Sequence, residues 1–362
     1  MDHPEGVAVD PASGKVFVVD CSNNRILRFS SAEAYQTAGA ADAVIGQPDF
    51  ETADAPAAPT SMNGHSKFDS PSGIAVDNSG NLYVADYEFH RVLRFDNAVS
   101  KSFEATANAV FGQPDLESSD NSVVSASSLN YPYGLSIGPK GELWVADAER
   151  YRVLRYDSAA SFSSGGDADG VLGQADFMAG MQSPSPTRST FVALYYVSVW
   201  VSDFSGARVM GFRDAIGKAD GSPADVLLGQ ATCTVAPHGS ANSRSLVGPA
   251  QIAFGREGSL FITVWDQSRV MRFSDPLSVQ PKTKTLKTNR SRVTIRGTST
   301  GAQRVQYKVS GQGGFKTVRG SVQNWKAKTK KLGKKRTRAA IRAIAFDGAV
   351  ASSRVYIVKK RR

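Results

Sequence analysis

The chain has 362 residues, 41% of them hydrophobic and 21% charged, which is the composition of a globular protein and excludes extensive disorder. At this length we expect two domains, or one repeated domain with an addition. The formal net charge of +10 is unevenly divided: residues 281–362 hold 24 Lys and Arg against one acidic residue, whereas residues 1–280 hold 19 basic and 32 acidic residues, so the two parts are opposite in charge.

A repeated segment runs through the first part of the chain. Each copy consists of pieces of about five residues, rich in Val, Ile, Leu, Phe and Tyr and bounded by turn residues, which is the pattern of strands. Four successive strands predict an antiparallel meander, and a series of such sheets that cover one another predicts a β-propeller. The aligned segments, each containing an arginine at the same place, are residues 16–29, 82–95, 143–156, 199–212 and 260–273.

A phrase built on Gly-Gln closes most units. We interpret it as the outermost strand of a blade, stopped by residues such as Gly46 and Pro48 so that the chain can cross to the next blade. The alternative is a role in ligand binding. The phrase occupies residues 42–50, 108–116, 169–177 and 225–233.

The last two units depart from the pattern. The fourth lacks the Pro-x-Gly opening, and its apolar run at residues 191–201, about half of the ~20 residues that a membrane span requires, predicts a buried strand. The fifth has Val264 where the other units have Asp, and no outer strand follows it. Five visible units predict five or six blades: either the ring closes imperfectly, or the chain begins inside a longer gene product.

The repeated motif identifies a family resemblance. Pro-x-Gly-hydrophobic-Ala-Val-Asp, followed by hydrophobic-Tyr-Val-Ala-Asp and Arg-Val-Leu-Arg-Phe, resembles the NHL repeat, and the GQPDF variant is similar to exported or cell-surface bacterial members. The resemblance implies a propeller over residues 1–275 and a secreted or cell-surface location, although no signal peptide is visible on the chain as given. It also implies framework residues, and we expect an ion pair within each of the four units that have both the Asp and the Arg. These are Asp20, Arg25, Asp86, Arg91, Asp147, Arg152, Asp203, Arg208 and Arg269.

The carboxyl-terminal part follows a predicted linker at residues 276–286. Residues 287–362 alternate apolar with basic residues, a period of two that is typical of half-buried strands. We expect a small basic β-sandwich that resembles bacterial immunoglobulin-like modules. Its positive face predicts attachment to an anionic surface, and the alternative is a face that is merely solvated. Nucleic acid is not the expected partner, because the aromatic residues here fall in strand patterns and form no stacking platform.

Recognition is expected on one face of the propeller. The turns between second and third strands and the long crossovers between blades emerge together there, and the turns carry aromatic residues beside polar ones, which suits a protein or carbohydrate ligand. The alternative is that these rings pack against the crossovers. The candidate binding residues are Tyr87, Glu88, Phe89, His90, Glu149, Arg150, Tyr151, Phe204, Trp265 and Asp266.

No motif of a known catalytic site is evident. Among the four histidines only His90 lies in a repeated element, so a metal-binding ring of imidazoles cannot be assembled, and Cys21 and Cys233 have no zinc-site spacing. We therefore predict a non-catalytic binding or scaffold protein that needs no metal or cofactor. The alternative is a metal-dependent hydrolase or lyase, because some related propellers are enzymes of that kind.

Overall fold

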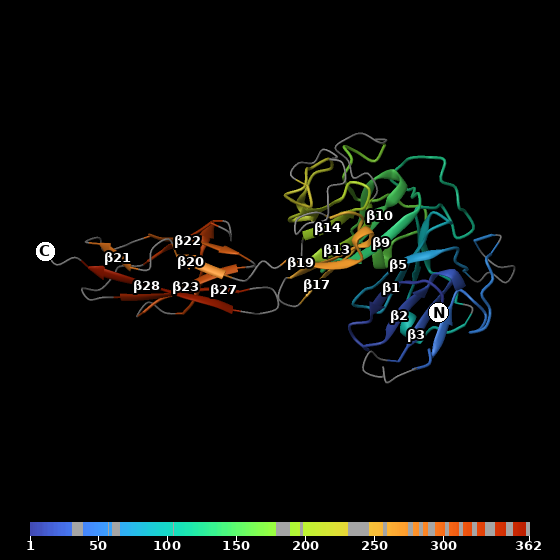
Figure 1. Ribbon diagram of the computed structural model, residues 1–362, viewed down its shortest axis with the longest axis horizontal. Coiled ribbons are helices and arrows are strands. Elements are labelled where there is room, and N and C mark those ends of the chain that lie inside the picture. Colours follow the sequence, from blue (N-terminus) through green and yellow to red (C-terminus); the bar gives the residue numbers. More distant parts are fainter. Residues whose placement is uncertain are drawn as a thin grey trace. The chain divides into compact units, whose positions relative to one another are not determined.

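The computed structural model of the chain is built from β-strands (Figure 1). In the described residues the helical elements are single turns of 3₁₀ helix, and no helix there is long and apolar enough to cross a membrane. The structure describes residues 1–30, 39–56, 58–59, 66–103, 105–178, 189–195, 198–230, 246–255, 259–273, 278–281, 285–288, 294–300, 304–310, 314–320, 324–329, 337–344 and 350–359.

Four antiparallel sheets of four strands each follow one another along the chain, with the strands of each sheet in sequence order. A fifth sheet has three strands among the described residues. The strands are β1 (Pro4–Val9), β2 (Val16–Asp20), β3 (Arg25–Phe29) and β4 (Ala43–Ile45); β5 (Pro71–Val76), β6 (Leu82–Asp86), β7 (Arg91–Phe95) and β8 (Ala109–Phe111); β9 (Pro132–Ile137), β10 (Leu143–Asp147), β11 (Arg152–Tyr156) and β12 (Gly170–Leu172); β13 (Ser189–Tyr195), β14 (Ser198–Asp203), β15 (Arg208–Phe212) and β16 (Val226–Leu228); and β17 (Pro249–Phe254), β18 (Leu260–Val264) and β19 (Arg269–Phe273).

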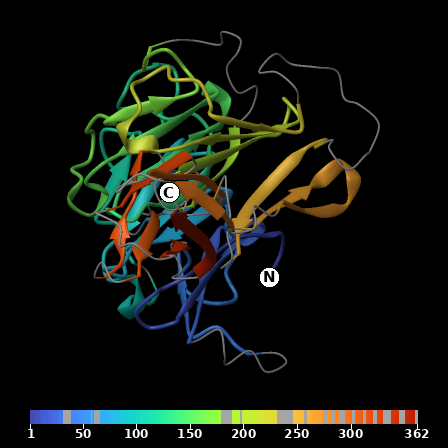
Figure 2. The same cartoon turned by 90° about the vertical axis from the view of Figure 1, so that its left-hand side faces the viewer.

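The sheets are arranged as the blades of a propeller. The first strand of each blade contacts the first strand of the next, β1 with β5, β5 with β9 and β9 with β13, so these strands are innermost. In Figure 2 the blades follow one another around this centre, from blue for the first through green to yellow for the fourth. The predicted all-β propeller, with its outer Gly-Gln strand in each of the first four units, is confirmed.

The fourth blade corrects one sequence expectation. The apolar run 191–201 does not form one buried strand, because it is divided between β13 and β14, which pair with each other from Tyr195 opposite Ser198 outward. Strands of the other blades have three to six residues. A single strand across the whole run would therefore outgrow its partners, and folding back lets its backbone groups pair within the blade.

Apolar side chains from neighbouring blades share one core. Phe17 and Ile26 of the first blade pack with Leu82 and Phe95 of the second, and Phe68 from the crossover joins them. Each of these side chains is fully buried, which stabilises the folded state by about 1.5–3 kcal/mol per side chain.

The inner strand of the first blade is an exception to this burial. Val7 and Val9 of β1 are 66% and 50% exposed, whereas Ile74, at the position of Val7 in the second blade, is 7% exposed. The strand therefore has one covered face, the one towards β5.

The Pro-x-Gly opening lets the inner strands approach closely. A Cβ atom on Gly6 would lie 2.6 Å from the carbonyl oxygen of Ser72, and one on Gly73 would lie 2.0 Å from that of Tyr133. The pairing of β1 with β2 and of β5 with β6 also shifts register at this place. Glycine is required because the backbone of the next blade occupies the space of a side chain.

A second arginine in each of the first three units ties neighbouring blades together. Arg28 donates to the carbonyl oxygen of Val99 at 2.8 Å, Arg94 to that of Ala159 at 2.8 Å, and Arg155 to that of Ile216 at 3.1 Å. Each acceptor lies just beyond the third strand of the following blade. The Arg-x-Leu-Arg motif thus supplies one arginine within the blade and one between blades.

The chain divides into two compact units, residues 1–253 with 262–271 and residues 254–261 with 272–362. The second unit contains two sheets, ordered β20-β22-β26-β25 and β21-β28-β27-β23-β24, in which β21 and β28 are parallel. Residues 276–286, for which a linker was expected, contain β20 and the start of β21. The bounds are β20 (Ser278–Pro281), β21 (Thr285–Thr288), β22 (Thr294–Thr300), β23 (Arg304–Val309), β24 (Lys316–Thr317), β25 (Arg319–Gly320), β26 (Asn324–Lys328), β27 (Thr337–Ile344) and β28 (Val350–Lys359).

Candidate ligand-binding site

The framework aspartates and arginines form buried ion pairs in the first four blades. The arginine Nε lies 2.8 Å from the carboxylate in the Arg25–Asp20 pair and 2.7 Å in the other three. In each pair the two residues face each other on the second and third strands of one blade. The within-blade ion pair read from the sequence is therefore present. The other three pairs are Arg91–Asp86, Arg152–Asp147 and Arg208–Asp203.

The same arginines hold the crossovers in place. Besides its ion pair, Arg91 donates to the carbonyl oxygens of Leu116, Pro59 and Lys67 at 2.5, 3.0 and 2.9 Å. Leu116 lies beyond the outer strand of its own blade, and Pro59 and Lys67 lie on the crossover that enters the blade. One buried guanidinium thus fixes both the incoming and the outgoing connection.

The glutamine of the Gly-Gln phrase has a structural role that sequence reasoning missed. Gln47 Nε2 donates to the carbonyl oxygens of Asn23 and Asp54 at 3.2 and 3.0 Å, and Gln113 Nε2 donates to those of His90 and Asp120 at 3.2 and 2.8 Å. The side chain therefore joins the turn between the second and third strands to the outgoing crossover. Recurrence of Gln after Gly was the only sequence signal for this role.

His90 joins its turn to the next blade. It has a left-handed backbone, φ 52°, and its Nδ1 accepts a hydrogen bond from the backbone N–H of Tyr131 at 3.2 Å. Asn121 contacts its Nε2 at 3.0 Å. Burial, and after it the charge of Arg150, lower the pKa of His90 below its usual value, so the neutral ring is favoured.

The candidate turn residues differ widely in accessibility. Phe89, His90 and Arg150, expected at an accessible surface, are only 7–8% exposed. Their side chains pack or bond inward, as Arg150 does to the carbonyl oxygen of Asn121 at 2.9 Å. Glu88, Trp265 and Asp266 are exposed, and Trp265 is 74% exposed. The remaining candidates, Tyr87, Glu149, Tyr151 and Phe204, are partly buried.

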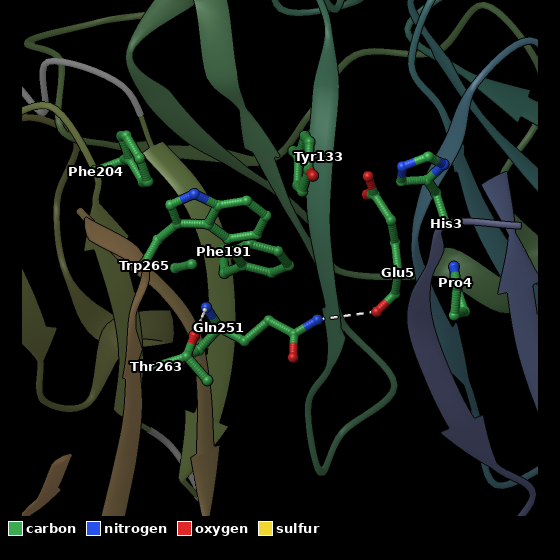
Figure 3. A pocket seen from close by; sticks show the side chains of 10 residues that line it. His3, Pro4, Glu5, Tyr133, Phe191, Phe204, Gln251, Thr263 and Trp265 are labelled. Atoms are coloured by element: carbon green, nitrogen blue, oxygen red, sulfur yellow. Dashed lines mark hydrogen bonds between the residues drawn. The ribbon is translucent and has the colours of Figure 1, made fainter. Parts of the chain in front are cut away.

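A cavity of about 490 Å³ opens near the inner strands of the propeller, in the compact unit of residues 1–253 and 262–271. Aromatic rings from separate blades line it, and two of the candidate residues, Phe204 and Trp265, are among them. Figure 3 shows the Trp265 ring between Phe204 and Tyr133, with the Glu5 carboxyl beside Tyr133. The lining residues are His3, Pro4, Glu5, Tyr133, Phe191, Phe204, Ala250, Gln251, Thr263 and Trp265.

Hydrogen bonds connect the strands around this cavity. The side-chain amide of Gln251 on β17 donates to the carbonyl oxygen of Glu5 on β1 at 2.9 Å, and the backbone N–H of Gln251 donates to Thr263 Oγ1 at 2.8 Å. The first and fifth blades therefore meet at the cavity. Residues of β9, β13 and β18 complete its wall.

Glu5 is the acidic group of the cavity. Burial raises its pKa, and a hydrogen bond from the Tyr133 hydroxyl and the proximity of His3 lower the pKa in part. Burial, together with the negative charge of Glu5, raises the pKa of Cys21 to about 11, which keeps this thiol neutral. The site thus combines one partly buried carboxylate with aromatic walls.

No group of three or more His, Cys, Asp or Glu side chains that could hold a metal ion occurs within the described part of the chain. His90, the histidine singled out from the repeat, bonds to backbone and to Asn121.

Comparison with known proteins bears on the fold. A model of the NHL repeat matches residues 1–29 and 68–95, which lie in the first two blades, and confirms the resemblance there. No curated protein matches the sequence. Among solved structures, a streptogramin B lyase is similar with 10% identity over 99% of this chain and 83% of that chain, at a TM-score of 0.42. Virginiamycin B lyase from Staphylococcus aureus has 10% identity, coverage of 97% and 94%, and a TM-score of 0.42. A chain of a nidogen/laminin complex has 15% identity, coverage of 75% and 76%, and a TM-score of 0.45.

Proposed function

We propose that this chain is a non-catalytic binding protein whose propeller recognises a protein or carbohydrate ligand at the cavity and at the adjoining turns. The observation that carries the proposal is the aromatic wall of the cavity, with Trp265 74% exposed. An exposed indole of this size is a common anchor in recognition sites, because it offers a large apolar surface at a small entropic cost. Gln251 and Thr263 add polar groups that can orient a ligand.

The test is a pair of variants of the full chain, screened on a peptide array and a glycan array. Trp265→Ala removes the exposed ring of the cavity, and Phe50→Ala removes a ring that is 40% exposed outside it. We expect Trp265→Ala to lose at least about tenfold in binding to the ligands that the unaltered chain selects, with little change in melting temperature. Equal binding by both variants would contradict the proposal.

The second unit, in this proposal, attaches the protein to an anionic surface. Arg296 on β22 lies directly opposite Lys326 on β26, and both side chains are exposed, as is that of Lys328. Like charges that lie directly opposite each other destabilise a sheet. An anionic partner would offset the repulsion between Arg296 and Lys326. We assign an immunoglobulin-like sandwich after the propeller, with β20 and β21 as part of it in place of the predicted linker. We also assign a secreted or cell-surface location, which the resemblance to exported NHL-repeat proteins favours.

A further inference from the structure

The carboxylate of Glu5 has unused capacity for a hydrogen bond. Its Oε2 is buried, and within the described ranges no donor reaches it. The Tyr133 hydroxyl donates to this carboxylate. The backbone carbonyl of Glu5 accepts from the side-chain amide of Gln251, and this bond holds Glu5 at the edge of the cavity. A buried acceptor without a donor is costly, so a ligand that donates to Oε2 would remove that cost.

Aromatic rings form the wall beside this carboxylate. The rings of Tyr133 and Phe191 meet edge to face, with centroids 5.0 Å apart and planes at 79°. Figure 3 shows the Trp265 ring beside those of Phe191 and Tyr133, and Phe204 on the side away from Glu5. The face of an aromatic ring is electron-rich and attracts cations, most strongly in Trp.

The cavity contributes little positive charge of its own. Among the described residues that line it there is neither Lys nor Arg. His3, the only lining residue that can become cationic, lies 2.9 Å from the Asp2 carboxylate and 2.9 Å from the Ser22 hydroxyl. Residues 1–280 also carry 13 more acidic than basic residues, so the surrounding field favours a cationic ligand.

We propose that the cavity takes an alkylammonium group, with Glu5 Oε2 accepting from the ammonium and the rings of Trp265, Phe191 and Tyr133 enclosing the methylenes next to it. This assignment rests on the proposed binding function and names the chemistry of the ligand. Two sources share this chemistry, the side chain of a lysine in a protein ligand and a free amine. A neutral carbohydrate would use the rings without needing the carboxylate.

The experiment measures binding of three small probes to the full chain by calorimetry at pH 7.5 and low salt. The probes are Nα-acetyl-lysine methylamide, its norleucine counterpart without the ammonium, and butylamine. We expect the lysine probe to bind about tenfold or more tightly than the norleucine probe, and binding to weaken as salt is added. Binding of butylamine as tight as that of the lysine probe would assign a free amine, and weaker binding would assign a lysine side chain. Equal binding of the lysine and norleucine probes overturns the proposal.

Two variants locate the effect. Glu5→Gln keeps the shape of the side chain and should lower affinity for the lysine probe about tenfold, whereas Asp167→Asn, at an exposed carboxylate that does not line the cavity, should leave it unchanged. Equal affinity of Glu5→Gln and the unaltered chain overturns the assignment. If array ligands bind through Trp265 and no ammonium probe binds, the proposed function stands and this inference fails.

The affinity of the unaltered chain for the lysine probe, measured as a function of pH, tests the role of Glu5 without altering that residue. Glu5 must be ionised to accept from an ammonium, so affinity should fall as the pH drops through its raised pKa. The titratable groups that face Glu5 are His3, Cys21 and Tyr133. Protonation of His3 would act in the same direction, and His3→Asn, which tolerates the left-handed backbone there, separates the two effects. An affinity independent of pH between about 7.5 and 4 contradicts the proposal.

Discussion

His90 occupies a position that recurs in every blade, the residue just before the third strand. Asn24, Tyr151, Ala207 and Ser268 stand there in the other units, and all five have a left-handed backbone. In the first blade the Oδ1 of Asn24 accepts from the backbone N–H of Ser70 at 3.0 Å, as Nδ1 of His90 does from Tyr131. The imidazole of the second blade therefore does the work of an amide oxygen.

This equivalence predicts how stability depends on pH. The pKa of His90 is lowered by folding, so its contribution to stability is present above about pH 6.5, the ordinary value, and is lost as the pH falls through the folded pKa. Protonation removes the Nδ1 acceptor, a hydrogen bond that contributes about 1 kcal/mol, and brings the ring into repulsion with Arg150, with Asp120 opposing this in part.

The measurement is urea unfolding of the unaltered chain and of His90→Asn between pH 7.5 and 5. The variant should be nearly as stable at pH 7.5, since Asn24 supports the same bond, and should lose less stability on acidification. The other three histidines, His3, His65 and His238, are present in both proteins, so the difference isolates His90. Identical pH profiles would show that the Tyr131 bond does not depend on the imidazole.

The inner strand is the element that sets the spacing of the blades. Gly73 on β5 stands where the carbonyl of Tyr133 on β9 approaches, and the next blade repeats the Pro-x-Gly sequence. The motif was recognised in the sequence as a family signature, but single-sequence reasoning could not say why glycine was needed. That reason lies in a neighbouring strand about 60 residues away in the chain.

Gly73→Ala should therefore destabilise the propeller. Its Cβ would lie 2.0 Å from a backbone oxygen, which cannot move aside as a side chain could, and we expect a loss of about 1–3 kcal/mol in the free energy of unfolding. Gly314→Ala serves as the control, because a Cβ there meets nothing within 4 Å. Thermal and urea unfolding measure both. A Gly73→Ala protein as stable as the control would show that the inner strands can separate.

The sequence predicted strands and ion pairs better than it predicted accessibility. The Asp–Arg pairs follow from a fixed spacing of five residues within one hairpin, which is local information. Whether Phe89 or Trp265 is exposed depends on what packs against the turn in the folded chain, and the sequence of the turn does not contain that information. Phe89 is 8% exposed, whereas Trp265 is 74% exposed, although both occupy the same kind of turn.

At the scale of the whole molecule the chain combines two units of opposite charge. The cavity was also beyond sequence reasoning at this scale, because its wall draws residues from positions 3 to 265. Glu5 and Tyr133 lie on the first strands of two blades, and nothing in the sequence of those strands distinguishes them from the first strands of the other blades. Only the closing of several blades around one centre makes them neighbours.

The charge asymmetry predicts attachment of the full chain to anionic vesicles. In vesicles of phosphatidylcholine with roughly one third phosphatidylserine, each Lys or Arg near the surface contributes about 1 kcal/mol. Binding should fall steeply with added salt, because the attraction is screened over about 8–10 Å at physiological ionic strength. Sedimentation with vesicles measures the bound fraction, and pure phosphatidylcholine should bind little.

A matched pair of triple variants assigns the surface. Replacement of Arg296, Lys326 and Lys328 with Gln removes three exposed charges from the second unit. The same replacement of Lys101, Lys140 and Arg213 removes three from the first, where Lys101 is half-buried and the other two are exposed. Only the first set should release the protein from the vesicles at moderate salt. Equal loss in both would mean that net charge alone is responsible, and no loss in either would contradict the anchor.

The buried arginines affect how the sequences of the crossovers between blades can change in evolution. Arg91 and Arg152 hold their crossovers through carbonyl oxygens, those of Leu116, Phe177 and others, and a carbonyl is the same whatever side chain the residue carries. Mutation can therefore change the side chains of a crossover without removing the hydrogen bonds that hold it to the blade. The propeller can accordingly serve as an exchangeable-loop scaffold, in which new specificities arise, or are grafted by design, while the blades stay constant.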